Sequence, residues 1–101
     1  MTVYPDWLEG DITWRDIAAG KPCDAGRCPY ALAIQRVFPD KQVTVWGRVV
    51  YIYPPGRPYH EAKYYLDFED QKFVCKFDER EPVKPRHFRL GLIYARPPQD
   101  S

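Results

Sequence analysis

A chain of 101 residues is long enough for one domain and too short for two independent hydrophobic cores. Its residues are 45% hydrophobic and 29% charged, which is typical of a globular protein and excludes a disordered or fibrous chain. The formal net charge of +1 excludes a surface that binds phosphate backbones through its overall charge, so any electrostatic site must be local.

Three features of the chain bear on its compartment. The first residues include Asp6 and Glu9 and do not form the basic stretch and apolar core of a secretory leader. No later stretch is long and apolar enough to span a bilayer, so no membrane partner is expected. The three cysteines are an odd number, which is typical of reduced thiols rather than of a disulfide framework. These features predict a cytoplasmic protein.

Composition and the eleven prolines divide the chain into three parts. Residues 1–10 are predicted to be a loose N-terminal arm, residues 11–96 a single domain and residues 97–101 a C-terminal tail. Within the domain, Thr13 can cap a single helical turn that stops at Gly20.

The centre of the chain predicts a helix and then strands. A proline that suits the first turn of a helix is followed by good helix formers, so residues 29–38 are predicted to be helical. Residues 42–53 are mostly β-branched or aromatic and predict strand, with Gly47-Arg48 as either a hairpin turn or a bulge in one long strand. After an exposed proline-rich loop, residues 63–66 can form another strand.

The last third of the chain predicts a helix followed by a strand. Phe73 and Phe77 are one helical turn apart and acidic residues crowd the preceding turn, which favours a helix near residues 67–79. A strand over residues 72–77 is the alternative. Residues 87–94 then alternate in a way that predicts a terminal strand with one apolar face. The residues of that face are Phe88, Leu90, Leu92 and Tyr94.

These elements predict an α+β fold in which two helices pack on one face of a small, mainly antiparallel sheet. The alternation in residues 42–53 and 87–94 leaves one sheet face apolar, and that face must be covered. An OB-like β-barrel with one N-terminal helix is the alternative fold.

The sequence offers little for catalysis. The only serine is Ser101 and asparagine is missing, which excludes serine-nucleophile chemistry. No two glycines have the G-x-G spacing, and no lysine follows a glycine-rich loop, so the usual cradles for nucleotide phosphates are missing. The chain is therefore predicted not to be an enzyme and to need no cofactor.

The cysteines have two chemical interpretations. Cys28 precedes a proline at a helix N-terminus, where the helix dipole and Arg27 would favour the reactive thiolate, although a cysteine there can also pack as a small hydrophobe. Cys23 and Cys28, with Cys75 and one of the histidines His60 and His87, could instead hold structural zinc. Four residues separate Cys23 from Cys28, which is a long spacing for a pair of zinc ligands. We therefore predict a packed Cys28, separate thiols and no metal.

The aromatic residues give the positive signal about function. Several tyrosines lie around the loop at residues 54–60, and aromatic faces flanked by guanidinium groups suit stacking with a base or with a partner side chain. The alternative is that these tyrosines only fill the core and cover the sheet rim. The predicted ligand- or partner-binding residues are Arg48, Tyr51, Tyr53, Arg57, Tyr59 and His60.

Charge is polarised along the chain. Residues 84–96 carry basic side chains and no carboxylate, whereas four of the five charged side chains in residues 1–16 are acidic. The basic stretch predicts either a phosphate-binding site formed by Lys84, Arg86 and Arg89 or a solvated strand edge that is protected from pairing.

Short motifs spread over most of the chain carry a family resemblance. They are Asp16-Ile17-Ala18-Ala19-Gly20, Cys28-Pro29-Tyr30-Ala31-Leu32-Ala33, Phe77-Asp78, Pro82-Val83-Lys84-Pro85 and Phe88-Arg89-Leu90. In combination they resemble a group of small uncharacterised proteins encoded by bacteriophages and their bacterial hosts. The resemblance implies a phage-type protein that binds and disables host machinery or captures host signalling nucleotides, and it implies no activity or site residue.

A second set of motifs lies in the middle third of the chain. They are Val43-Thr44-Val45-Trp46-Gly47-Arg48-Val49, Tyr64-Tyr65-Leu66-Asp67-Phe68-Glu69-Asp70 and Phe73-Val74-Cys75-Lys76-Phe77. This run is similar to the first three strands of an OB-fold nucleic-acid-binding barrel, in which a glycine bends the first strand. Pro82 and Pro85 suit the rest of such a barrel poorly, so this resemblance ranks second.

Together these observations predict a small phage-type binding protein that acts stoichiometrically as an inhibitor of a host protein or defence system. One alternative is a nucleotide-signal sponge with an aromatic and arginine pocket, formed at a homo-oligomer interface because so small a chain has little room for a deep cleft. The other alternative is an OB-like module that binds single-stranded nucleic acid. The expected partner is a host protein in the host cytoplasm.

Overall fold

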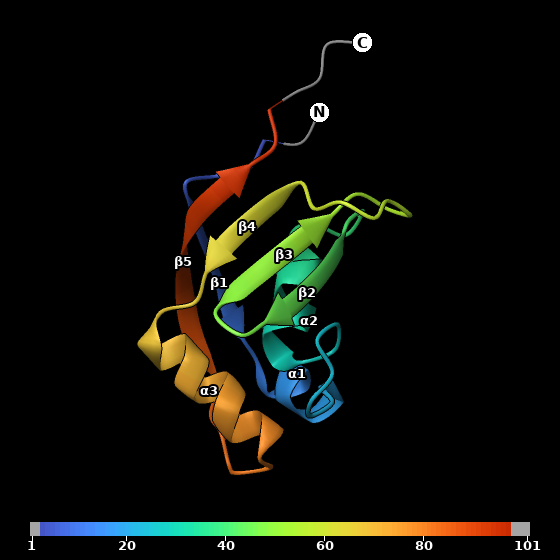
Figure 1. Cartoon of the computed structure of the whole chain (residues 1–101). Helices are drawn as coiled ribbons and strands as arrows, with labels where there is room; N and C mark the ends of the chain where they lie inside the picture. Colours follow the sequence, from blue (N-terminus) through green and yellow to red (C-terminus); the bar gives the residue numbers. More distant parts are fainter. Residues whose placement is uncertain (1–2, 98–101) are drawn as a thin grey trace.

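The computed structural model describes residues 3–97, and these form three helices and one antiparallel sheet of five strands (Figure 1). The strands are β1 (Trp7–Ile12), β2 (Gln42–Trp46), β3 (Val49–Tyr53), β4 (Ala62–Tyr65) and β5 (Arg86–Ala95), in the sheet order β1-β5-β4-β3-β2. The helices are α1 (Trp14–Ala19), α2 (Pro29–Val37) and α3 (Phe68–Asp78). The predicted α+β fold is confirmed.

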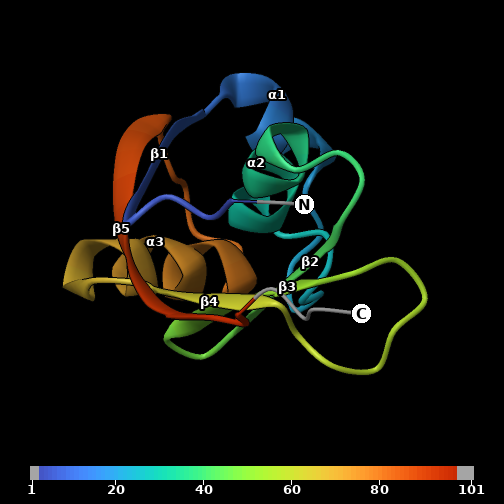
Figure 2. The same cartoon turned by 90° about the horizontal axis from the view of Figure 1, so that it is seen from above.

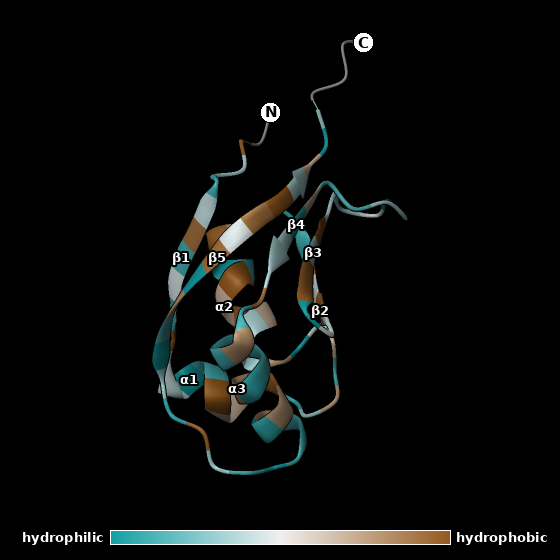
Figure 3. Cartoon of the chain, turned by 60° about the vertical axis from the view of Figure 1, so that its left-hand side comes forward, coloured by the Kyte–Doolittle hydropathy of each residue, from teal (hydrophilic) through white to brown (hydrophobic). Residues whose placement is uncertain are grey.

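The sheet curls into a half-barrel with α2 inside the curl (Figure 2), and α1 and α3 lie at one end of the sheet (Figure 1). Helix α2 contacts β1 and β2, the two edge strands, so it closes the open side of the curl. The hydropathy colours alternate along β1 and β5, as expected for strands with one buried face (Figure 3). The buried residues of this inner face include Leu8, Val45, Val50, Ile52, Tyr64, Phe88 and Leu90. Among the described residues, no helix covers the opposite, outer face (Figure 2).

Local capping sets the start of each helix. Thr13 caps α1 and Asp67 caps α3, and each forms a reciprocal capping box with the residue three positions later. Residues 72–77 are therefore helical, which makes the alternative strand prediction wrong and places a helix where the OB resemblance needs a third strand. Within residues 3–97, no helix has both the length and the apolar character that crossing a membrane requires.

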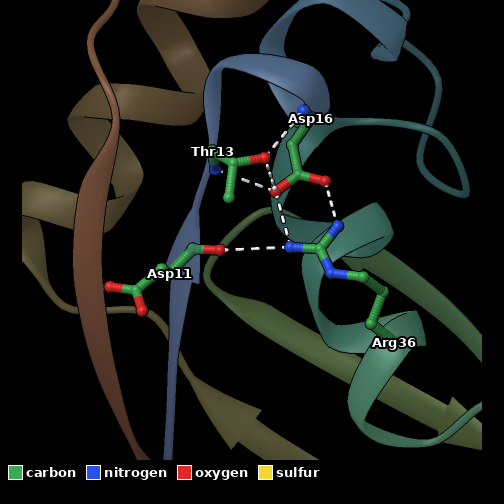
Figure 4. A network of polar contacts seen from close by, with 4 residues as sticks. All are labelled: Asp11, Thr13, Asp16 and Arg36. Carbon is green, nitrogen blue, oxygen red and sulfur yellow. Dashed lines mark hydrogen bonds and ion pairs between the residues drawn. The ribbon is translucent and has the colours of Figure 1, made fainter.

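Two buried carboxylates tie the helices together. Asp16 of α1 pairs with Arg36 of α2, and the same guanidinium donates to the backbone carbonyl oxygen of Asp11 at 3.3 Å (Figure 4). Asp70 of α3 accepts a hydrogen bond from the hydroxyl group of Tyr30 in α2. Each aspartate is thus both part of a capping box and a link between two elements.

The hairpin between β2 and β3 settles an alternative that the sequence left open. Trp46 pairs with Val49, so Gly47 and Arg48 form a two-residue turn and not a bulge. Gly47 has a φ of +57°, which is the conformation that the first turn residue of a tight hairpin requires and that glycine adopts without strain.

The N-terminal arm differs from the prediction. Residues 7–10 belong to β1, because Leu8 is buried and pairs with Leu90 of β5. The sequence of β1 does not indicate a strand, because its six residues include a glycine and two acidic residues and its pairing partner is far away in the chain. Residues 1–2 of the predicted arm and 98–101 of the predicted tail lie outside the described residues.

Replacing Gly10 by alanine is expected to lower the free energy of unfolding by about 1 to 3 kcal/mol, because it overpacks the core. Gly10 lies opposite Phe88, and an added Cβ would approach Cζ of that buried ring to 2.7 Å. Gly26→Ala is the matched control, since the nearest atom to its added Cβ is 3.8 Å away. Urea unfolding followed by tryptophan fluorescence measures both, and equal stability of the two variants would contradict the prediction.

Candidate functional site

An aromatic row crosses the outer face of the sheet. Residues that lie directly opposite each other on antiparallel strands point to the same side, so side chains gather along lines that cross the sheet. The aromatic row, from β2 to β1, consists of Trp46, Val49, Tyr65, Gly91 and Trp7. Trp46 is 70% exposed, Tyr65 45% and Trp7 53%. These large apolar side chains therefore face solvent on a sheet face that the described helices leave open.

At the β1 end of the aromatic row, Trp7 packs against neighbouring residues. Gly91 leaves space for the Trp7 ring, since a Cβ at that position would come 3.3 Å from Cζ3 of Trp7. The Arg89 guanidinium stacks on Trp7 at 4.0 Å from the ring centroid, and its Nε lies 3.6 Å from Oε1 of Glu9. One face of the Trp7 ring is therefore already occupied by a cation.

A tyrosine–histidine cluster lies beside the aromatic row. It consists of Tyr51 and Tyr53 of β3, Tyr94 of β5 and His60 of the loop before β4. The His60 ring centroid lies 5.5 Å from that of Tyr51, 6.2 Å from Tyr53 and 5.7 Å from Tyr94, with the rings edge to face. Three of the six residues predicted from the sequence, Tyr51, Tyr53 and His60, are thus brought together.

The position of Tyr94 corrects the sequence-based prediction. Simple alternation along β5 assigns Tyr94 to the apolar face with Leu92, but a bulge shifts the register between β4 and β5. Leu92 pairs with Tyr64 and Tyr94 pairs with Lys63, so Ile93 is the extra residue. Because side-chain direction has a period of two, one extra residue moves Tyr94 to the outer face.

The tyrosine–histidine cluster is electropositive. Nζ of Lys63 lies 5.7 Å from the Tyr94 ring centroid, and the Arg96 guanidinium stacks on Tyr59 at 4.3 Å. Partial burial and these two cations lower the pKa of His60. The imidazole is therefore neutral at neutral pH, and the positive charge of the site comes from Lys63 and Arg96.

The remaining predicted residues divide between two places. Arg57 lines a shallow hollow together with Tyr53, so it belongs to the margin of the tyrosine–histidine cluster. Tyr59 joins the margin through its contact with Arg96. Arg48, in contrast, lies in the β2–β3 turn at the other end of β3 and is not brought to this cluster.

The predicted phosphate-binding residues do not form one group. Lys84 and Arg86 line a hollow of about 280 Å³ with Lys72 and Lys76 of α3, a combination that the sequence did not indicate. Arg89 lies on the outer face with Trp7. Arg86 is turned toward the buried Asp70, with Nη2 at 3.3 Å from Oδ1, so part of its charge is already paired.

A hollow of about 680 Å³, the cysteine groove, is lined by all three cysteines. It lies between the β2–β3 hairpin, α3 and the loop before α2. Cys23, Cys28 and Cys75 all line it, together with Trp46 and Arg48. A chain of this size therefore forms a substantial cleft of its own.

Of the three thiols, Cys28 is buried, whereas Cys23 and Cys75 are exposed. Burial raises the pKa of Cys28 to about 11, although its sulfur accepts a hydrogen bond from the Ala31 backbone N–H as the cap of α2. The packing interpretation of Cys28 is thus confirmed. The pKa of Cys75 is also raised, chiefly by the charge of Glu79. Among residues 3–97, no three His, Cys, Asp or Glu side chains gather in a way that suits a metal ion.

Sequence reasoning missed the residues that only strand pairing brings to the outer face. Trp46 and Tyr65 were not among the predicted binding residues, since an aromatic residue in a strand is as often buried as exposed. Tyr94 was assigned to the core because the bulge was not visible in the sequence. Comparisons of the chain with models of known protein families, with curated proteins and with solved structures found no match.

Proposed function

We propose that the protein acts by stoichiometric binding and that the outer face of its sheet contacts an acidic surface of a partner protein. The observation that carries the proposal is the aromatic row, which crosses the sheet from β2 to β1 with large side chains exposed to solvent. Contiguous exposed apolar surface on a small domain typically marks an interaction site. Tyrosine, tryptophan and arginine, which compose this face, are the residues most enriched at interface hot spots.

Charge favours an acidic partner. Arg57, Lys63 and Arg96 surround the tyrosine–histidine cluster, whereas the charge of Arg89 at the end of the aromatic row is already paired with Glu9. Complementary charge at the rim speeds encounter and fixes orientation, while the buried aromatic centre supplies affinity.

The composition of the face favours a protein over single-stranded nucleic acid. Val49 and the half-exposed Ile93 add aliphatic surface that bases do not need. The Arg89 guanidinium already covers one face of Trp7, and the cluster rings contact each other edge to face, which suits a continuous apolar patch better than separate stacking platforms. Given the phage-type resemblance, the partner would be a host protein that the binding disables.

The proposal predicts site-specific cross-linking from the outer face. A photo-reactive phenylalanine analogue at Tyr65 or at Tyr94 should cross-link one and the same protein in a bacterial lysate, in a complex with the mass of one copy of each chain. The same analogue at Trp14, which is 63% exposed on α1 and outside the outer face, is the matched control and should not yield that product. Tyr65→Ala with Tyr94→Ala should weaken binding of the purified partner at least about tenfold, since two hot-spot residues are removed.

Two outcomes would contradict this function. Equal cross-linking from Trp14 would show that the outer face is not the contact surface. A cross-linked species that a nuclease removes, with affinity that falls steeply as salt rises, would show that the ligand is nucleic acid. Both replaced side chains are exposed, so the double variant should keep its fold. Circular dichroism and urea unfolding check that it does.

A further inference from the structure

The cysteine groove has the size of a small-molecule site. Its volume of about 680 Å³ lies within the range of clefts that hold small ligands, roughly 300 to 1,000 Å³. Val45 and Val74 give it apolar walls, and Trp46 stands at its rim with most of its ring in solvent. An exposed indole beside a cleft offers a flat π face on which a ligand can lie.

The polar lining of the cysteine groove is mainly acidic. Asp24, Asp78 and Glu79 line the groove against one cation, Arg48. Within residues 3–97, none of the three carboxylates lies within 4.0 Å of a lysine, arginine or histidine nitrogen. The groove therefore differs in sign from the electropositive cluster on the outer face.

The hydrogen bonds of these carboxylates come from neutral donors. Oδ1 of Asp78 accepts from the backbone N–H of Cys23 at 2.9 Å, and Oε1 of Glu79 accepts from Sγ of Cys75 at 3.8 Å. Both side chains are held at the groove with their negative charge uncompensated by a cation. The raised pKa of Cys75, which the charges of Glu79, Glu81 and Asp78 cause, reports the same negative potential at the groove wall.

We infer that the cysteine groove binds a small organic cation, an amine or guanidine with an apolar or aromatic body. The body lies against the valine walls with Trp46 at the rim, and the cationic group faces Asp78 and Glu79. Carboxylate pairing selects positive charge, and the apolar walls select a hydrophobic stem. This site is separate from the protein-binding function proposed for the outer face, with which it shares only Trp46.

The test uses three probes of one shape and different charge. Phenethylamine is the cation, 2-phenylethanol the neutral analogue and 3-phenylpropionate the anion. Titration followed by two-dimensional NMR should show phenethylamine shifting the Trp46 indole N–H and the amides of Val45 and Val74, with the Trp14 indole as an internal control. We expect phenethylamine to bind at least about fivefold more tightly than 2-phenylethanol, and the anion not to bind.

Variants of the groove separate its charge from its shape. Asp78→Asn keeps an oxygen that can accept the Cys23 N–H, and with Glu79→Gln it should remove the fivefold preference for the cation. Glu69→Gln, the same change on the same helix outside the groove, is the matched control and should leave the preference intact. Equal binding of the three probes, or shifts centred away from the groove, would overturn the inference. Cross-linking from Tyr65 and Tyr94 is unaffected by Asp78→Asn, so each proposal can fail without the other.

Discussion

Replacing Arg36 by alanine is expected to lower the free energy of unfolding by about 2 to 3 kcal/mol, because it leaves a buried carboxylate without its counter-charge. Asp16 is 2% exposed, and its oxygens accept from both terminal nitrogens of Arg36 and from the backbone N–H of Thr13 (Figure 4). Half of the Arg36 side chain is exposed, so solvent screening keeps the expected cost toward the lower end for a broken buried pair.

The stability lost in Arg36→Ala should be larger at neutral pH than at acidic pH. Burial alone would raise the pKa of Asp16, but the hydrogen bonds from Arg36 and Thr13 outweigh burial and lower it. A carboxyl with a lowered folded-state pKa stabilises the fold above its unfolded pKa, about 3.9, and that contribution is lost as pH falls through the folded-state pKa. The penalty should therefore be full at neutral pH and shrink below about pH 4.

Urea unfolding of the wild type and two variants at pH 7 and at pH 3 measures this effect. Arg15→Ala is the matched control, because Arg15 is an exposed arginine on α1 that forms no ion pair among the described residues. It should change stability by less than about 0.5 kcal/mol. A penalty for Arg36→Ala that equals the control, or that is the same at both pH values, would show that the pair with Asp16 contributes little.

Replacing Tyr30 by alanine is expected to cost about 3 to 5 kcal/mol of stability, the largest effect predicted for this chain. Tyr30 is fully buried in the first turn of α2, with its ring centroid 5.4 Å from that of Phe73 and 5.6 Å from that of Phe88. The single side chain thus joins α2 to α3 and to β5. Truncation removes the contacts of a whole aromatic ring and leaves a cavity that the packed sheet cannot fill.

Tyr30→Phe isolates the hydroxyl group, which donates to Oδ1 of Asp70 at 2.5 Å. Burial raises the pKa of Asp70, and this outweighs the hydrogen bonds from Tyr30 and from the backbone N–H of Asp67, which lower it. When the pKa of a carboxyl group is raised in the folded state, the protein loses stability as pH rises through that pKa. Removing the Tyr30 hydroxyl group would raise the pKa of Asp70 further. The Tyr30→Phe penalty should therefore be about 1 kcal/mol at pH 4 and larger at pH 7.

Tyr64→Phe is the matched control for this pH dependence. Tyr64 is also fully buried, but its hydroxyl group donates to the backbone carbonyl oxygen of Pro5 at 2.7 Å, and that acceptor does not titrate. Its penalty should be the same at pH 4 and pH 7. Equilibrium unfolding at the two pH values compares the variants, and a pH-independent penalty for Tyr30→Phe would contradict the role assigned to Asp70.

The sequence by itself determined the features that depend on neighbours within four residues. The helix starts at Thr13 and near Asp67 follow from capping bonds to the third residue along. The periodicities of the α2 segment and of residues 87–94 then sufficed to predict an α+β fold with one apolar sheet face. All of these signals are local, so no knowledge of strand order was needed.

Only the tertiary structure decided which residues meet across the sheet. The pairing of β1 with β5 and the bulge at Ile93 are non-local, because they depend on strands that are far apart in the sequence. The β1–β5 pairing placed residues 7–10 in the sheet, and the bulge turned Tyr94 outward. The pairing of β2 with β3 and of β3 with β4 aligned Trp46 and Tyr65 in one row. The three cysteines share a groove for the same reason, since the tertiary structure places α3, which carries Cys75, beside the loop that carries the other two.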